Sequence, residues 1–510
     1  MKKKLLPLAL AAAAGLTGIN SAHAVNVNPA GTGEVLIYPF YTVEGGQDTL
    51  FSVVNTTNET KAVKVRILEA MNTQEVLDFN LYLSPQDHWS AAITATSDGA
   101  QILTGDTSCT VPLSLSAKSV GATGTPQPFR NFEYVDDEIN DGLERTREGY
   151  IEIIEMGEVD ETDAEAAILH ANGLPDDCAF LDAEWKKGAG GIFATQTSNM
   201  QEPAGGLYGY GVLIDVAEGT AAGYDAVALE AFSDAALHTN PGSLSPALNQ
   251  ASPATAVVID GVTARTATFV SGIDAVSAVM MHSAISNDYI LDADLNAGTD
   301  WVITMPTKRE YVNKYALADD ILVAPFSSVW NPATTTACEQ ITISYFDREE
   351  GRVTVAPEDN DFSPRPPVAA DPVLSLCKEA NVVTFNSADV LEATDRVKSN
   401  LNLDDGYDAG WLTVGLTTVE ASVTTGKTIE NFDGVDSTDN PAIDPAVRKL
   451  TSYEGGAAPA NLGDTNSLTF DGLPVVGFAV QSYVNGANSG TLANYNAALA
   501  HKTTTVVTVN

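Results

Sequence analysis

The sequence predicts a mainly β protein, with an N-terminal immunoglobulin-like antiparallel β-sandwich followed by further β-rich regions and a few short helices. Two observations support this fold class. Short segments alternate apolar and polar residues, and Gly, Asn, Asp or Pro separate them, which is typical of antiparallel sandwiches. Hydrophobic residues make up 44% of the chain, enough to build a core. At roughly 100–200 residues per domain, 510 residues predict two to four domains.

The N-terminal segments carry the alternation most clearly. In residues 61–69, Val63, Val65 and Ile67 lie on one face, and Lys64 and Arg66 lie on the other. This pattern predicts a strand with one apolar and one polar face. The strands expected in this region span residues 34–43, 48–57, 61–69, 78–84, 90–96 and 110–115.

The rest of the chain is less regular. A Ser-, Gly-, Thr- and Pro-rich stretch at 116–128 predicts a linker or a long loop. Helices are expected at 163–171 and 178–187, and further strands at 147–155, 205–216, 226–232, 301–312, 340–346, 381–385, 410–419, 475–484 and 503–509. The predicted units are a sandwich at 25–125, a β-rich domain with short helices at 126–330, and a C-terminal β-rich domain at 331–510. One sheet could still draw strands from both sides of either boundary.

Residues 1–24 predict a signal peptide. Three lysines precede an apolar stretch of about a dozen residues, and Ala22-His23-Ala24 fits a cleavage site. The apolar stretch is shorter than the roughly 20 residues that span a bilayer. No later stretch has that length either, so we expect an exported chain without membrane insertion, located outside the cell or on its surface, with the periplasm as the alternative.

The composition is strongly acidic, with 67 Asp and Glu against 26 Lys and Arg, a net charge of −41 and a pI near 4.2. This balance argues against a general nucleic-acid binder, because phosphates are neutralised by clustered basic residues. It also argues against docking on anionic lipid. Either bound calcium or adaptation to high salt could account for the acidity.

The four cysteines predict two disulfides, Cys109–Cys178 and Cys338–Cys377, in an oxidising compartment. Three pairings are possible, and this one joins sequence neighbours. A zinc site is the competing idea, but no CxxC motif is present and no His stands at ligand spacing beside any Cys.

Calcium is the expected cofactor, if there is one. Asp292, Asp294, Asn296 and Asp300 place oxygen ligands at alternating positions, as a calcium loop would. The glycine and the final glutamate of an EF-hand are missing, because Ile303 occupies the twelfth position. The alternative is an acidic turn that only keeps the protein solvated.

The sequence carries no motif that defines a reaction. Neither GxSxG nor HExxH is present, and His282 reads as an ordinary buried histidine. We therefore expect a structural or binding protein with no catalytic residues. The alternative is a secreted hydrolase or carbohydrate-binding protein that uses an acidic pair and an aromatic platform, such as Trp89, Trp185, Trp301, Trp330 or Trp411.

Phrases in the first part of the chain resemble a known group. The opening strands, Leu77–Pro85 (LDFNLYLSP), Gly149–Gly157 (GYIEIIEMG) and Thr299–Lys308 (TDWVITMPTK) are similar to a group of exported proteobacterial proteins labelled only as cell surface proteins. The resemblance covers roughly the first 315 residues. It implies a surface-located protein of adhesion, matrix or surface-layer type, with cell-surface components or copies of itself as partners, and it implies nothing about mechanism.

Overall fold

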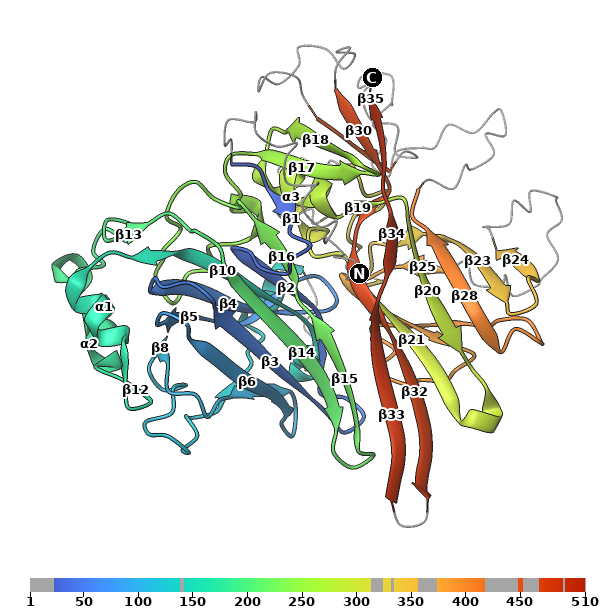
Figure 1. Ribbon diagram of the computed structural model, residues 1–510, viewed down its shortest axis with the longest axis horizontal. Helices are drawn as coiled ribbons and strands as arrows, with labels where there is room; N and C mark the ends of the chain where they lie inside the picture. Colours follow the sequence, from blue (N-terminus) through green and yellow to red (C-terminus); the bar gives the residue numbers. More distant parts are fainter. Residues whose placement is uncertain are drawn as a thin grey trace, which may run out of the picture.

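The computed structural model describes residues 23–137, 142–312, 324–331, 334–355, 374–417, 448–452, 467–488 and 491–509. The expected signal peptide lies almost wholly outside these residues. The structure is 48% strand and 12% helix, which confirms the mainly β class. Figure 1 shows two β-rich halves, the first in blue and green and the second in yellow to red.

The first half is built from two large antiparallel sheets. The eight-stranded sheet has the order β1 (Asn26–Val27), β16 (Val227–Glu230), β2 (Val35–Thr42), β10 (Glu148–Val159), β4 (Lys61–Glu69), β5 (Glu75–Leu83) and β8 (Cys109–Val111), with β13 (Met200–Gln201) beside β10. The six-stranded sheet has the order β15 (Thr220–Asp225), β14 (Leu207–Asp215), β3 (Gln47–Asn55), β6 (His88–Ala95), β7 (Ala100–Leu103) and β9 (Gln127–Pro128).

A shared apolar core packs these two sheets against each other as a sandwich. Trp89 of the six-stranded sheet is fully buried. Its ring centroid lies 5.9 Å from that of Phe79 in the opposite sheet and 5.6 Å from that of Phe51 in its own sheet. Strands from both sides of residue 125 complete both sheets, and the immunoglobulin-like arrangement of residues 25–125 stays a prediction.

The eight-stranded sheet is buried on its second face as well. In β2, Leu36 and Tyr38 belong to the sandwich core, whereas Val35 and Ile37 belong to a different core cluster. This second cluster includes α3 (Gly272–Met280). A third cluster joins the same outer face to α1 (Thr162–Ile168) and α2 (Cys178–Lys186).

Because this second face is covered, two charged side chains on it are buried. The alternation of residues 61–69 predicts that both, Lys64 and Arg66, lie on a polar face. The ammonium group of Lys64 donates to Asp78 Oδ2 at 2.9 Å and to the carbonyl oxygens of Asn240 and Ser243 at 3.2 Å. Arg66 is paired in the same way between Glu75 (2.8 Å) and Glu152 (2.6 Å). Buried charges need such partners, because desolvation penalises an isolated ion.

The second half contains two five-stranded sheets. One has the order β24 (Arg352–Val355), β23 (Thr342–Asp347), β28 (Ala409–Gly415), β20 (Ala284–Ile290) and β34 (Lys502–Thr504). The other has the order β27 (Lys398–Leu401), β26 (Ala380–Phe385), β21 (Ala297–Thr304), β32 (Val476–Asn488) and β33 (Thr491–Ala500). Strands from both sides of residue 330 build each sheet. Among the strands that the structure describes, only β26 and β27 pair in parallel.

The second of these sheets joins the two halves. The two five-stranded sheets share a core, and we call them the C-terminal sandwich. Trp301 and Ile303 of β21 pack into this core, whereas Val302 between them belongs to the core of the N-terminal sandwich. At the same junction, Tyr224 of β15 stacks on Phe478 of β32 with ring centroids 4.4 Å apart. The Tyr224 hydroxyl donates to the carbonyl oxygen of Phe40.

Smaller elements fill the space around the sheets. A three-stranded sheet consists of β29 (Lys449–Thr451), β30 (Leu468–Asp471) and β35 (Val506–Val509). The short pairs are β11 (His170–Ala171) with β12 (Leu174–Pro175), β17 (Thr255–Asp260) with β18 (Thr263–Thr268), β19 (Met281–His282) with β31 (Leu473–Pro474), and β22 (Glu339–Gln340) with β25 (Ser375–Leu376).

The chain departs from the expected elements at several places. The strand expected at 110–115 ends at Val111. The helix expected at 163–171 ends at Ile168, and residues 170–171 form β11. The strand expected at 301–312 ends at Thr304, and α4 (Arg309–Val312) follows a turn. Pro306 lies in that turn and has no N–H to donate to a neighbouring strand. The expected strand at 503–509 is present as β34 and β35, and both pair within this chain.

Both predicted disulfides are present. Cys109 is joined to Cys178 and Cys338 to Cys377, and no described cysteine is free. The first bridge ties β8 to the start of α2. It therefore crosses the domain boundary expected near residue 125.

We predict that Phe478→Ala destabilises the whole chain. The substitution removes the Tyr224 stack and leaves a cavity between the halves, so the free energy of unfolding should fall by about 3–5 kcal/mol. Tyr495→Ala, at a side chain that is 63% exposed, is the control and should change it by less than about 0.5 kcal/mol. Urea unfolding followed by circular dichroism measures both. Equal effects of the two variants would show that the halves do not depend on this contact.

Candidate binding site on the second sandwich

The outer face of the sheet that contains β28 carries an exposed tryptophan. Along β28, Leu412 and Val414 point into the core, whereas Trp411 and Thr413 point outward. Trp411 is 43% exposed. The other four tryptophans lie elsewhere: Trp89, Trp301 and Trp330 are buried, and Trp185 is half-buried against Phe193. Trp411 is therefore the tryptophan that can meet a ligand.

Trp411 belongs to a stack of planar side chains on three neighbouring strands. Its cross-strand partner on β23 is Phe346, and the two rings lie 4.2 Å apart with an angle of 5° between their planes. The guanidinium carbon of Arg352 on β24 lies 5.5 Å from the centroid of the Phe346 ring. On the other side of Trp411 its partner is Asp288 of β20. The stack thus ends at Trp411 on the β20 side.

A hollow of ≈ 330 Å³ lies at this end of the stack. The walls are formed by Ser286, Asn287, Asp288, Trp411, Leu499, Ala500 and Lys502. Strand β34 pairs with β20 only from Ala284 to Ser286, so the edge of β20 beyond Ser286 is left without a neighbouring strand. The chain passes from β33 to β34 at this edge, and this crossing contributes Leu499, Ala500 and Lys502 to the walls.

A half-buried histidine holds the crossing in place. His501 Nε2 lies 2.9 Å from the carbonyl oxygen of Val302, so this nitrogen carries the proton and donates it. The other ring nitrogen, Nδ1, then accepts from the side-chain amide of Asn287 at 3.1 Å. The same amide donates to the carbonyl oxygen of Leu499 at 2.8 Å. Burial lowers the pKa of His501 to about 4, so the ring stays neutral in this arrangement.

Two charged groups in the hollow remain available to a ligand. The Asp288 carboxylate and the Lys502 ammonium group form no hydrogen bond or ion pair with another described residue. Asp288 is the one carboxylate among the described residues that line the hollow. The site therefore combines an aromatic face, an apolar wall at Leu499, one acceptor group and one cation.

The four residues proposed as calcium ligands do not converge in the structure. Asp292 Oδ1 accepts the backbone N–H groups of Asp294 and Leu295 and so begins a short turn. Asn296 donates its side-chain amide to Asn485. Asp300 is buried in β21, where its Oδ2 accepts the N–H of Leu391, and burial raises its pKa to about 6. Among the described residues, no three His, Cys, Asp or Glu side chains gather as metal ligands.

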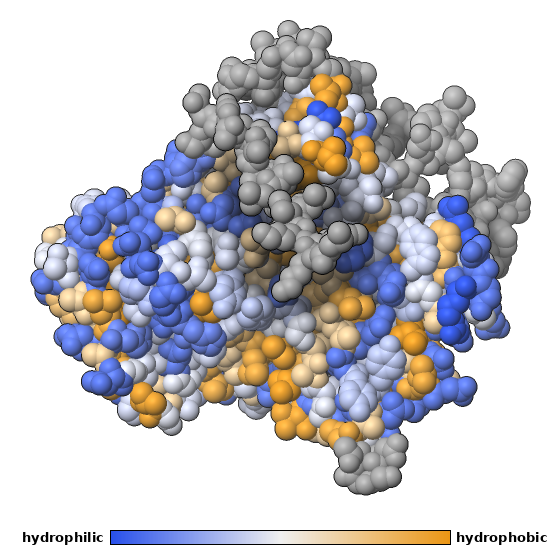
Figure 2. Space-filling model, viewed as in Figure 1, coloured by the Kyte–Doolittle hydropathy of each residue, from blue (hydrophilic) through white to orange (hydrophobic). Residues whose placement is uncertain are grey.

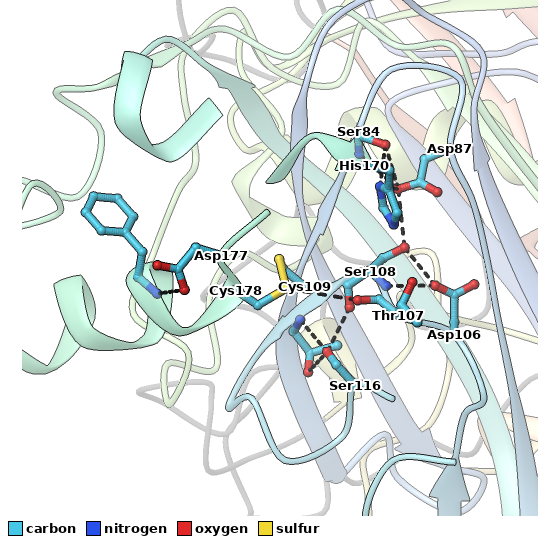
Figure 3. Close-up of a disulfide and its surroundings, with 12 residues drawn as sticks. Ser84, Asp87, Asp106, Thr107, Ser108, Cys109, Ser116, His170, Asp177 and Cys178 are labelled. Carbon is cyan, nitrogen blue, oxygen red and sulfur yellow. Dashed lines mark hydrogen bonds and ion pairs between the residues drawn. A yellow bond between two sulfur atoms is a disulfide. The ribbon is translucent and has the colours of Figure 1, made fainter. Parts of the chain in front are cut away.

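A Ser, His and Asp group lies next to the first disulfide (Figure 3). Ser84 Oγ lies 2.9 Å from His170 Nδ1 and 3.2 Å from Asp87 Oδ2. Asp87 Oδ2 is 3.9 Å from the same Nδ1. In a hydrolytic triad the serine and the aspartate use opposite ring nitrogens, whereas here both lie on the Nδ1 side. Asp87 also accepts from Ser84 N and Ser108 Oγ, so the group stabilises a turn beside β8.

Two further histidines have hydrogen-bond partners, and His238 is buried whereas His282 is half-buried. His238 Nδ1 lies 2.7 Å from the carbonyl oxygen of Gln196, and its Nε2 lies 2.9 Å from the hydroxyl of Tyr82. His282 Nδ1 lies 3.1 Å from Thr505 Oγ1. Burial lowers the pKa of each to about 4. Neither ring faces the hollow.

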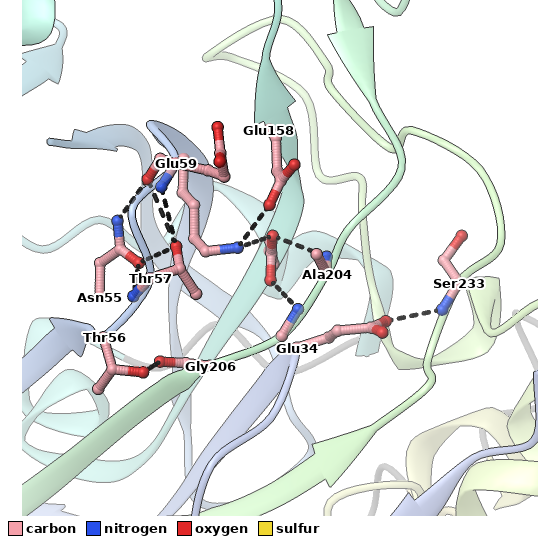
Figure 4. Close-up of polar contacts among 12 residues, drawn as sticks. Glu34, Asn55, Thr56, Thr57, Glu59, Glu158, Ala204, Gly206 and Ser233 are labelled. Atoms are coloured by element: carbon pink, nitrogen blue, oxygen red, sulfur yellow. Dashed lines mark hydrogen bonds and ion pairs between the residues drawn. The ribbon is translucent and has the colours of Figure 1, made fainter. Parts of the chain in front are cut away.

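Several carboxylates gather at one end of the N-terminal sandwich (Figure 4). Glu155 accepts from Lys61 Nζ at 2.6 Å and from the N–H groups of Ala204 and Gly205. Glu34 Oε2 accepts the N–H groups of Phe232 (2.7 Å) and Ser233 (3.0 Å). Burial raises the pKa of Glu34 to about 8 and that of Glu155 to about 6. These contacts tie the loops at 204–205 and 232–233 to β10 and to the start of β2.

The outer face of the six-stranded sheet exposes several apolar side chains. Leu50 is 40% exposed and Tyr210 is 48% exposed, and Figure 2 shows hydrophobic side chains gathered over the region of β3 and β14.

No helix among the described residues is long and apolar enough to cross a bilayer. Comparison of the chain with protein-family models, curated proteins and solved structures finds no match.

Sequence reasoning named Trp411 only as one of five scattered tryptophans and missed Phe346, Asp288, Leu499 and Lys502. A signal for Trp411 was present, because residues 409–415 alternate and place it on the polar face with Thr413. The other residues come from strands far apart in the sequence. Only the pairing of β23, β28, β20 and β34, together with the passage of the chain from β33 to β34, brings them together.

We predict that the free energy of unfolding falls less with rising pH in Glu34→Gln than in the wild type, up to neutral and higher pH. The folded chain holds the Glu34 proton up to about pH 8, whereas the unfolded chain releases it near pH 4.5. The contribution of this group is therefore present below pH 4.5 and is lost as pH rises towards 8, by at most about 1.4 kcal/mol per pH unit. Urea unfolding at pH 5, 6, 7 and 8 should show a smaller decline for the variant than for the wild type.

Glu59→Gln, at an exposed residue of the same region, is the matched control and should follow the wild-type curve. If the Glu34 variant follows it as well, then Glu34 ionises in the folded chain as it does in the unfolded chain.

Proposed function

We propose that this chain is an exported protein that binds a component of the cell surface through the hollow beside Trp411. The leader-like residues 1–24 and the two disulfides support export. The acidic surface and the phrase resemblance to exported cell surface proteins support a location outside the cytoplasm.

The observation that carries the binding role is the unfinished stack at Trp411. An exposed tryptophan of this kind is unusual on the surface of a chain with a net charge of −41, and ligand sites typically combine aromatic walls with a few polar groups. The hollow offers one carboxylate, Asp288, among its described residues. Glycoside hydrolysis needs a pair of carboxylates on either side of the bond, so binding is favoured over hydrolysis.

The location is tested by adding protease to intact cells of the source organism and detecting the chain by immunoblot. We expect the chain to be digested on intact cells while a periplasmic marker stays intact. Digestion only after the outer membrane is permeabilised would place the chain in the periplasm. Fractionation with cytoplasmic markers would contradict export.

The binding site is tested by capture on isolated envelope fragments. We expect the purified chain without residues 1–24 to bind the fragments saturably. Trp411→Ala should weaken capture at least about 30-fold, as expected for an anchoring tryptophan. Tyr210→Ala, at an exposed aromatic of the other sandwich, is the control and should bind as the wild type does. Equal capture by all three proteins would reject the hollow as the site. Sedimentation of the same proteins tests whether copies of the chain are the partner instead.

A further inference from the structure

We propose that the ligand of the Trp411 hollow is an uncharged sugar ring of a glycan. This inference rests on the proposed binding role and names its chemistry. It is carried by the geometry of the stack and by the polar groups beside it.

A flat, weakly polarised group fits as the next layer of the stack, on the exposed side of Trp411. Phe346 and Trp411 already lie face to face, and the guanidinium carbon of Arg352 lies 5.5 Å from the centroid of the Phe346 ring. An aromatic face carries negative charge density, so it attracts the polarised C–H groups on one face of a pyranose ring. Leu499 and Ala500, which also line the hollow, offer apolar contact to such a ring.

The polar groups around Trp411 match the hydroxyl rim of a sugar. Asp288 is the cross-strand neighbour of Trp411, and Ser286 lies two residues before it on the same face of β20. Side chains two residues apart on a strand are separated by about 7 Å, close to the width of a sugar ring. The Asp288 carboxylate can accept from two neighbouring hydroxyls, and Ser286 and Lys502, paired across β20 and β34, can donate to ring or hydroxyl oxygens.

The charge of the site selects an uncharged sugar. A net charge of −41 repels polyanions at long range. At short range, the Asp288 carboxylate would repel a uronate, phosphate or sulfate stacked on Trp411. One cation, Lys502, lines the hollow, far fewer than a nucleic-acid or phosphate polymer needs.

The size of the hollow sets the length of the ligand segment. A volume of ≈ 330 Å³ lies at the lower end of the range of ligand sites, about 300–1,000 Å³. One or two rings fit, and the rest of a glycan chain would extend over the exposed face, whose next row of residues contains Thr413 and Ser344.

The chemical nature of the ligand is tested on the envelope fragments themselves. Mild periodate cleaves vicinal diols in sugars, so pretreatment with periodate and then borohydride should abolish capture of the wild-type chain. Pretreatment with proteinase K should leave capture unchanged. Capture that survives periodate and is lost after proteinase K would overturn the sugar assignment, although the loss of capture by Trp411→Ala would still support the binding site.

The neutral charge is tested with defined oligosaccharides. Titration of tryptophan fluorescence with uncharged hexose and N-acetylhexosamine oligomers should saturate for at least one of them, whereas uronic acid oligomers should not bind. Asp288→Asn should weaken the uncharged ligand at least about 10-fold, which corresponds to the loss of one charge-assisted hydrogen bond, and should allow uronates to bind. Trp411→Phe should keep more affinity than Trp411→Ala, because it keeps an aromatic face.

Two outcomes would overturn the inference here. Binding of uronates but not of uncharged oligomers to the wild type would show that Asp288 does not set the charge preference. Sugar binding that is unchanged in Trp411→Ala would place the sugar elsewhere. Circular dichroism and thermal melting of each variant show that the losses do not come from unfolding, and Tyr210→Ala again serves as the control.

Discussion

The structure depends on the burial of two sheets on both of their faces. The eight-stranded sheet separates the N-terminal sandwich core from the cores that contain the helices, and the sheet of β21 and β32 separates the core of the C-terminal sandwich from that of the N-terminal one. Alternate residues of a single strand therefore serve different cores, as Trp301 and Val302 do. A sheet covered in this way cannot be removed without exposing apolar surface on both sides, so the two halves are expected to unfold together.

Double burial also explains where the charges lie. A strand with polar residues on its second face would normally turn them to water. Here loops and helices cover that face, so each charge needs a partner. Lys61 is paired with Glu155, and Arg145 with Glu69, with all four side chains fully buried. Glu69 also accepts the N–H groups of Met71, Asn72 and Gln74, which orders the turn that contacts Glu379 and Ala380 of the second half through the carbonyl oxygen of Ala70.

The two outer sheets have free faces, and the candidate site lies on one of them. The face of the six-stranded sheet exposes apolar side chains such as Leu50 and Tyr210, whereas the face that contains Trp411 has a stack that ends at a hollow. The hollow exists because β34 is short and covers only part of the edge of β20. The neutral ring of His501 holds the crossing chain at that edge. A site made of a strand edge, a crossing chain and an exposed ring needs no loop to close over it, and this suits the binding of one segment of a long polymer.

The sequence by itself determined the fold class, most of the strands, the helices at α1 and α2, and both disulfide pairs, because alternation, turn residues and cysteine spacing are local signals. Only the tertiary structure decided which faces are buried, since Lys64 and Arg66 alternate with apolar residues whether or not a loop covers them. It also decided which tryptophan is exposed and which residues surround it. Trp411, Phe346, Asp288 and Lys502 come from four strands spread over more than 200 residues, and the pairing between those strands is set by the packing of two sandwiches rather than by any local pattern.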